Sequence, residues 1–236
     1  MTVQQILDEL QSLGRESYKR VLMQNHGVQE PCFGVAISAM APLRKKIGQD
    51  YRLALELYET GNYDAMYLAG LVADDAAMTR EDLNRWVARA YGGSLPGTTV
   101  PSVAAGGPHG HALAREWIGS PHPPVAAAGW ATWSCLVSVL PDSRLDLDEL
   151  KGLLARVEKT LHASPDAVRY QMNSYVICVG SYVPALTDLA VETSGRIGPV
   201  QADLGNNACQ IPDAAAYIRK VQAQGKLGKK RKKLKC

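Results

Sequence analysis

The stretch from Pro108 to Val139 constrains the fold of this chain more than any other. It reads PHGHALAREWIGSPHPPVAAAGWATWSCLVSV, two helical segments separated by a proline-rich turn, and the second segment is apolar or small on nearly every side. A helix that is apolar on every side has to be covered on every side. We therefore expect it at the packing centre of an all-helical protein, with Trp130 and Trp133 on one shared face. The alternative is that these two tryptophans form the wall of a binding site.

Helical periodicity also recurs along the rest of the chain, whereas the alternating pattern of strands is scarce. Thr2, Asp50, Thr79 and Asp146 each precede an amphipathic segment and are typical N-caps. The stretch YGGSLPGTTVPSVAAGGP is the least regular interior segment. About eleven helices joined by short connections favour antiparallel helix pairs stacked as an α-solenoid, an all-α superhelix, with no fixed sequence period.

The net charge of +3 is unevenly distributed along the 236 residues. The last twelve residues, GKLGKKRKKLKC, contain seven of the 26 basic residues and no acidic one. The remaining 19 basic and all 23 acidic residues lie in residues 1–224, which gives that part a formal charge of −4. We expect residues 1–224 to form one helical domain and residues 225–236 to be a flexible basic tail. Such a tail either binds polyanions such as nucleic acid or keeps the protein in solution.

Composition argues against several other classes of protein. The sequence contains no run of about 18 apolar residues, so we expect no transmembrane helix. The amphipathic N-terminus is unlike a signal peptide. The pair His109 and His111 has no third ligand nearby, so we expect no metal site and no cofactor. The cysteines stand singly, which suits reduced thiols in the cytoplasm; they are Cys32, Cys135, Cys178, Cys209 and Cys236.

Four segments together resemble bacterial DNA alkylation repair proteins of the AlkD-like class. They are AGLVADDAAMTREDLNRWV, PHGHALAREWIGSP, AAAGWATWS and YIRKVQAQGKLGKKRKK, and the resemblance extends roughly from Ile6 to Lys233. It implies an α-solenoid of degenerate HEAT-like helix pairs whose concave surface holds duplex DNA. Active members of that family release alkylated purines by cleaving the N-glycosidic bond, without a metal or a cofactor. The resemblance therefore implies a DNA-binding protein in which such excision is an open question.

The residues that this chemistry requires are not found at the matching positions. Cleavage develops positive charge on the sugar, which a nearby carboxylate stabilises. Active relatives carry a tryptophan and an aspartate one helical turn apart, just ahead of a Val-Pro pair. Here the pair is Val100-Pro101, and the tryptophan and the aspartate would fall near Gly93 and Gly97. The chain thus resembles a branch of the family without the usual catalytic pair.

An enzyme of this branch would need substitute catalytic groups. Glu116, Asp82 and Asp203 are the candidate carboxylates, and Tyr175 falls near the position of another family aromatic. In the loop of residues 198–212, a nucleophilic Cys209 would need a histidine or a helix N-terminus to lower its pKa, and no histidine follows His162. Whether the chain is an enzyme therefore stays open.

We expect DNA contacts from basic residues and from the two tryptophans of the central helix. The predicted contacts are Arg44, Lys45, Lys46, Arg115, Trp130, Trp133, Arg169, Lys229, Lys230, Arg231, Lys232 and Lys233. The leading hypothesis is a monomeric cytoplasmic protein that grips duplex DNA. The alternative is a non-catalytic helical scaffold for protein–protein interaction, which the charge of −4 on residues 1–224 favours and the basic tail opposes.

Overall fold

The computed structural model describes residues 1–205 and 210–235, and every regular element in those ranges is a helix. The all-α prediction is therefore confirmed for the described residues. They fall into two compact units. Unit 1 comprises residues 1–110 with Leu204, Gly205 and Lys235, and unit 2 comprises residues 111–203 and 210–234.

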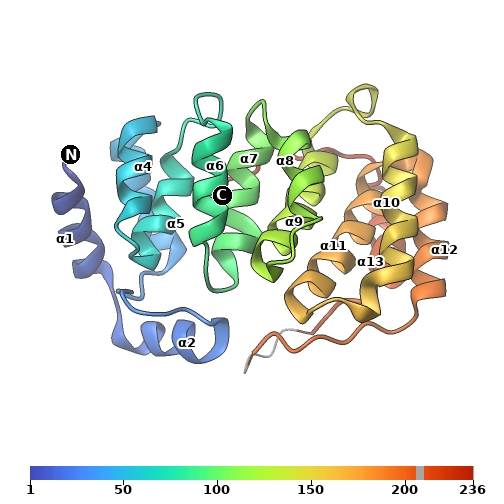
Figure 1. Cartoon of the computed structure of the whole chain (residues 1–236), viewed down its shortest axis with the longest axis horizontal. Coiled ribbons are helices and arrows are strands. Elements are labelled where there is room, and N and C mark those ends of the chain that lie inside the picture. Colours follow the sequence, from blue (N-terminus) through green and yellow to red (C-terminus); the bar gives the residue numbers. More distant parts are fainter. Residues whose placement is uncertain (206–209, 236) are drawn as a thin grey trace. The chain divides into compact units, whose positions relative to one another are not determined.

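Unit 1 is built from short helices, several of which are visible as neighbouring rods in Figure 1. They are α1 (Val3–Leu13), α2 (Glu16–His26), α3 (Ala41–Ile47), α4 (Tyr51–Glu59), α5 (Tyr63–Val72), α6 (Arg80–Arg89) and α7 (Val100–Gly106), with a 3-10 turn η1 (Ile37–Met40) before α3. The predicted caps Thr2 and Thr79 form capping boxes with Gln5 and Asp82. Asp50 accepts the Leu53 N–H at 3.0 Å and so starts α4.

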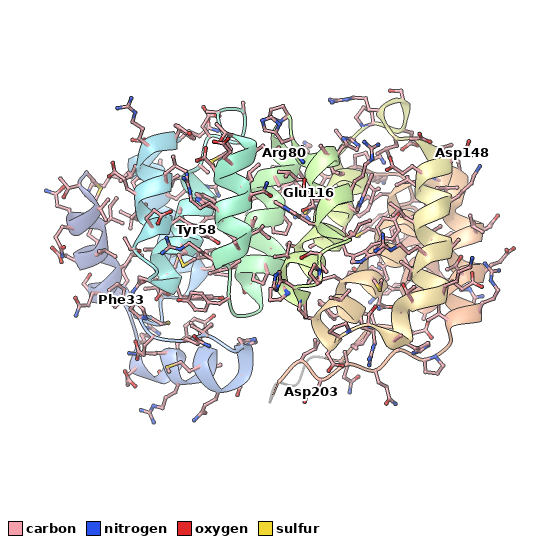
Figure 2. The ribbon with its side chains drawn as sticks, in the orientation of Figure 1. Phe33, Tyr58, Arg80, Glu116, Asp148 and Asp203 are labelled. Atoms are coloured by element: carbon pink, nitrogen blue, oxygen red, sulfur yellow. The ribbon has the colours of Figure 1, made fainter. Side chains whose placement is uncertain are left out.

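An aromatic stack joins α4 and α6 in the core of unit 1. Tyr58 (Figure 2) and Trp86 lie with ring centroids 4.1 Å apart and planes 6° apart. The Tyr58 hydroxyl donates a hydrogen bond of 2.9 Å to the Trp86 carbonyl, so its polar end is satisfied although the residue is fully buried. Stacked aromatic pairs contribute about 0.5–1.5 kcal/mol beyond the area that they bury.

The segment before α7 differs from our expectation of an irregular stretch. Residues Leu95–Thr99 form a π-helix, η2, which continues directly into α7. Leu95 and Val100 are completely buried, and Pro101 lies in the first turn of α7, where its missing N–H costs no hydrogen bond. The glycines in the sequence obscured a helical segment that burial of its apolar residues stabilises.

Unit 2 is organised around two long helices, α9 (Pro123–Val139) and α11 (Asp166–Tyr182), which pack against each other. The other helices are α8 (Gly110–Trp117), α10 (Leu147–Thr160), α12 (Thr187–Ile197) and α13 (Ala214–Ala223), with 3-10 turns η3 (Asp142–Arg144), η4 (Leu161–Ala163) and η5 (Pro184–Leu186). Gly129 permits a close approach of the end of α8, because a Cβ there would lie 2.5 Å from the Ile118 nitrogen. Figure 1 shows α12 and α13 beside α11.

No single helix within the described ranges is long and apolar enough to cross a membrane. One pair of segments, Asp166–Tyr182 with Pro184–Ile197, reaches the required length and composition together, but the two are bent by 118° at the break between them.

Candidate nucleic-acid interface

The two tryptophans of α9 lie in the core of unit 2. Trp130 is 0 % exposed and Trp133 is 1 % exposed. Tyr175 of α11 lies with its ring centroid 5.3 Å from that of Trp130, and the Arg156 guanidinium lies 5.7 Å from the Trp130 ring. Neither indole face is open to a base, which corrects the prediction that these two residues contact nucleic acid. The packing interpretation of α9 is the one that their position supports.

Tyr175, a candidate catalytic residue, is also completely buried. Its hydroxyl donates to the Leu150 carbonyl at 3.3 Å, and burial raises the pKa of the phenol well above its usual value. A buried and protonated phenol reaches neither a substrate nor solvent. Tyr175 is therefore part of the core, and the prediction of a catalytic role for it is wrong.

The three candidate carboxylates occupy different settings. Asp82 in unit 1 is buried and accepts hydrogen bonds from the Tyr51 hydroxyl at 2.8 Å and from Thr79. Burial alone would raise its pKa, but these hydrogen bonds lower it more, so the carboxyl is ionised and held in place. Glu116 on α8 and Asp203 after α12 are exposed residues of unit 2 (Figure 2). Of the three, only Glu116 and Asp203 are accessible to a substrate.

The segment around Gly93 and Gly97, where the sequence predicts the catalytic position, contains no acidic side chain. No aspartate or glutamate lies between Asp82 and Glu116 in the sequence. Gly97 lies within η2, and its N–H donates to the Gly93 carbonyl at 3.2 Å. Among the side chains of η2, the Thr99 hydroxyl is buried without a hydrogen-bond partner, and a hydroxyl cannot replace a carboxylate.

The basic triplet of unit 1 lies in the last turn of α3. Lys46 forms an ion pair with Glu9 at 2.9 Å. Arg44 and Lys45 line a depression of about 450 Å³, to which Lys46 does not contribute; its other lining residues are Ala41, Gly48, Gln49 and Leu71. The three consecutive basic residues are therefore not equivalent.

Two of the predicted arginine contacts of unit 2, Arg115 and Arg169, are engaged within the protein. Arg115 donates to both carboxylate oxygens of Glu149, at 2.5 and 2.6 Å. Arg169 donates to the carbonyls of Gln201 and Ser164, at 2.6 and 2.8 Å, and so fixes the two ends of the α11–α12 region. Both side chains have structural roles that the sequence pattern did not reveal.

The basic C-terminal segment makes defined contacts with unit 2. The Gly228 N–H donates to the Ser181 carbonyl at 2.9 Å, and the Arg231 N–H donates to the Ser138 carbonyl at 2.8 Å. The Lys230 ammonium donates to the Val137 carbonyl at 2.9 Å and pairs with Asp142 at 2.8 Å. Five basic side chains of this segment are exposed: Lys226, Lys229, Arg231, Lys232 and Lys233.

Sequence reasoning overlooked the ion pair between Lys235 and Asp75, which lies within unit 1. The Lys235 ammonium lies 2.5 Å from the Asp75 carboxylate and donates to the Ala73 carbonyl at 2.8 Å. Burial raises the pKa of Asp75 and lowers that of Lys235, since both charges lose contact with water. No sequence motif predicts an ion pair between residues 160 positions apart. The sequence shows only that Asp74 and Asp75 are adjacent acidic residues and that the C-terminal segment is basic.

The described histidines and thiols were the remaining candidates for a metal centre or a nucleophile. The described residues contain no group of three or more metal-ligating side chains. His111 lies edge-on against Trp133, with ring centroids 5.6 Å apart. Burial raises the pKa of Cys32 to about 12 and that of Cys178 to about 11, so both thiols are protonated. Asn206, Asn207 and Cys209 of the late loop lie outside the described residues.

Comparison with known proteins identifies the family. The family model described as DNA alkylation repair enzyme matches residues 6–218. This chain belongs to the DNA alkylation repair enzyme family. Two similar proteins are the uncharacterized proteins Lin0241 of Listeria innocua and Lmo0209 of Listeria monocytogenes, and each is 29% identical to this chain. The match to Lin0241 covers 94% of this chain and 98% of Lin0241. The match to Lmo0209 covers 96% of this chain and 100% of Lmo0209.

A solved structure has a similar fold over the whole length of this chain. It is 35% identical, covers 100% of both chains and has a TM-score of 0.92. It represents a new family of proteins related to the HEAT-like repeat DNA glycosylases, with affinity for branched DNA structures. This likeness confirms the prediction of HEAT-like helix pairs, the all-α solenoid class.

Proposed function

We propose that this chain is a DNA-binding protein that prefers branched DNA over linear duplex and does not excise alkylated purines. The observation that carries the proposal is the likeness, at 35% identity along the whole chain, to a protein from a family with affinity for branched DNA structures. The exposed cations of the C-terminal segment support it, because basic side chains that neutralise phosphates supply most of the affinity for nucleic acid. The position of those cations at the surface of unit 2 leaves them accessible.

The absence of excision follows from the chemistry of the matching segment. Cleavage of the N-glycosidic bond requires a group that stabilises positive charge on the sugar, and a carboxylate is the usual one. The family's tryptophan and aspartate positions fall near Gly93 and Gly97, in a region without any acidic residue. Incubation with methylated DNA should release no methylpurine above background. Release that depends on the protein would contradict this part of the proposal and direct attention to Glu116 and Asp203.

Preference for branched DNA is tested by fluorescence anisotropy with a labelled four-way junction and a linear duplex of the same length and composition. We expect tighter binding of the junction, and the unlabelled junction should compete better than the duplex. Equal affinities would overturn the preference while leaving DNA binding intact. No saturable binding of either DNA would overturn the whole proposal.

The role of the C-terminal cations calls for charge substitutions rather than for deletion of the segment. Deletion would also remove the contacts of Lys230 and Lys235, and the loss would mix folding with binding. The slope of the logarithm of the binding constant against the logarithm of the salt concentration measures the number of phosphate contacts. The triple variant Lys229→Ala, Lys232→Ala and Lys233→Ala should reduce this slope by about 3, since each phosphate contact contributes about one unit. Its matched control changes the same net charge elsewhere in unit 2: Arg144→Ala, Lys151→Ala and Lys159→Ala. Equal slopes in the two triple variants would exclude the segment as a DNA contact.

A protein–protein scaffold is the second candidate function, because residues 1–224 carry a formal charge of −4. It would be favoured if neither DNA bound saturably while the folded protein captured a protein partner. We further propose a monomer in the bacterial cytoplasm, where thiols such as Cys32 and Cys178 stay reduced. Sedimentation analysis of the protein alone tests the monomer.

A further inference from the structure

The depression beside α3 in unit 1 is formed by three parts of the fold. Ala41, Arg44 and Lys45 come from α3, Gly48 and Gln49 from the turn after it, and Leu71 from α5. The turn is possible because Gly48 adopts a positive φ of 74°, and the space around its Cα is open. The depression has a volume of about 450 Å³. It is thus large enough to receive part of a ligand rather than a single water molecule.

The lining of this depression is positively charged. Arg44 and Lys45 contribute two cations, Gln49 contributes an amide, and none of the six lining residues is acidic. Lys45 and Gln49 are exposed and Arg44 is half-buried, so the polar groups lie around an accessible opening. A planar guanidinium beside an ammonium and an amide suits the oxygens of a phosphate.

A third cation of unit 1 lies close to the depression. The Lys235 ammonium is held at the end of α5 by Asp75 and by the Ala73 carbonyl, two residues after the lining residue Leu71. Arg44 is near enough to Lys235 to depress the pKa of its ammonium, after the larger effect of burial. Asp75 pairs with Lys235, and Asp74 is close enough to raise the pKa of the same ammonium, so the positive charge at the depression is that of the lining residues Arg44 and Lys45.

The neighbouring Lys46 shows that this arrangement is specific to part of the basic triplet. Lys46 pairs with Glu9 of α1 at 2.9 Å and does not line the depression. An attraction between basic residues and the C-terminal end of a helix accounts for all three residues equally. It does not account for the convergence of Arg44 and Lys45 on one opening.

We propose that this depression binds a phosphate of the DNA backbone, with Arg44 and Lys45 as the contacting residues. Lys235 stays in its ion pair with Asp75 and takes no part in the contact. This inference rests on the proposed DNA binding and assigns one contact surface to unit 1, in addition to the exposed cations of unit 2. Backbone contacts of this kind carry no sequence information, which suits a protein that recognises the form of DNA rather than its bases.

The test uses a double variant that combines Arg44→Gln and Lys45→Gln. It is compared with the control variant Lys46→Gln and with the unaltered protein. Anisotropy with the labelled four-way junction is measured across a salt series from about 50 to 200 mM, a range in which phosphate contacts dominate the change in affinity. We expect the double variant to lower the salt slope by about 2, and Lys45→Gln alone by about 1. Lys46→Gln should leave the slope close to that of the unaltered protein.

A double variant with the slope of the Lys46→Gln control would overturn the inference, provided that thermal unfolding shows both variants folded. If Arg44→Gln impairs folding, the single variant Lys45→Gln decides, because Lys45 is exposed. Absence of saturable binding by the unaltered protein would instead overturn the proposed function itself. The two failures are therefore distinguishable in one series of measurements.

Discussion

Unit 1 and unit 2 are stabilised by different kinds of interaction. In unit 1, buried carboxylates organise the chain: Asp64 is 1 % exposed and accepts the N–H groups of Phe33, Gly34 and Val35 at 2.6, 3.2 and 2.8 Å. Asp82 performs a similar role at the start of α6. Short helices leave long connections, and their backbone groups require partners when buried. Directed hydrogen bonds therefore determine the conformation of the connections in unit 1.

In unit 2, close packing between long helices stabilises the fold. The α9 and α11 helices are 17 residues each, and their buried aromatic side chains meet at Trp130 and Tyr175. Small residues such as Gly129 and Gly180 allow neighbouring segments to approach. Long apolar helices satisfy their own backbone, so the stability of unit 2 depends on volume and shape. The same fold class thus uses two different means of stabilisation, and substitutions separate them.

Removal of the Trp130 side chain should give the largest effect, in unit 2. Trp130→Ala creates a cavity in a completely buried site and should lower the free energy of unfolding by about 3–5 kcal/mol. Urea unfolding followed by circular dichroism measures it. Trp130→Phe, which keeps an aromatic ring beside Tyr175, should cost less. Similar small losses for both variants would mean that packing around α9 is looser than the structure shows.

Removal of the Asp64 carboxyl tests the polar side of the comparison, in unit 1. Asp64→Ala removes the acceptor of three N–H donors, the part-buried one of Phe33 (Figure 2) and the buried ones of Gly34 and Val35. We expect a loss of about 3 kcal/mol, since an unsatisfied buried donor costs about 1–3 kcal/mol and the segment relaxes in part. Hydrogen exchange at residues 33–35 should accelerate more than elsewhere in unit 1.

The control for this experiment is Asp64→Asn, which keeps the size of the side chain and one acceptor oxygen. It should fall between the unaltered protein and Asp64→Ala. If both variants unfold at the same urea concentration as the unaltered protein, directed hydrogen bonds do not distinguish unit 1 from unit 2.

Glycine substitutions provide a third and smaller contrast. A Cβ at Gly70 in unit 1 would overlap the Thr99 methyl group, whereas a Cβ at Gly129 in unit 2 would meet the backbone of Ile118 at 2.5 Å. Both Gly→Ala variants should lose about 1–3 kcal/mol by overpacking. Thr99→Ser removes the methyl group that obstructs Gly70→Ala, so the double variant should recover most of that loss in a double-mutant cycle.

No side-chain change should rescue Gly129→Ala to the same degree, because its obstruction includes backbone atoms. Equal recovery in the two units, with Ile118→Leu as the partner substitution that removes the Cγ2 methyl group facing Gly129, would contradict the contrast. Thr99→Ser alone is the reference for the cycle in unit 1.

Much of this arrangement was predictable from local pattern. Capping by Thr2, Asp50 and Thr79 and the central place of α9 followed from residue type and spacing, because each depends on neighbours in sequence. The helix at Leu95–Gly106 was not predicted, because its glycines and prolines have low helix propensity and burial in the folded unit overrides that propensity.

The candidate interface was less predictable than the fold. Basic residues are identified by type, but whether a cation is used inside the protein depends on distant partners, as with Arg115 and Glu149 or Lys235 and Asp75. Arg44 and Lys46 stand two positions apart and have different surroundings for the same reason. Only the three-dimensional structure shows which charges remain at an opening.

The smallest predicted effect concerns the pH dependence of unit 2 through His111. Burial, with a further contribution from Arg115, lowers the pKa of His111 in the folded protein below its usual value near 6.5. The unfolded chain therefore binds this proton at a higher pH than the folded protein does. The contribution of His111 to stability is fully present above about pH 6.5 and is lost as the pH falls through the folded pKa.

The variant His111→Gln removes this contribution. Between about pH 7.5 and pH 5, its free energy of unfolding should fall less than that of the unaltered protein, since only the unaltered protein pays for protonation beside Trp133. Urea unfolding at several pH values in this window measures the difference. Parallel pH profiles of the two proteins would show that protonation of His111 does not lower the free energy of unfolding. The surroundings of Trp133 would then tolerate a charge as well as the hydrogen-bonded connections of unit 1 do.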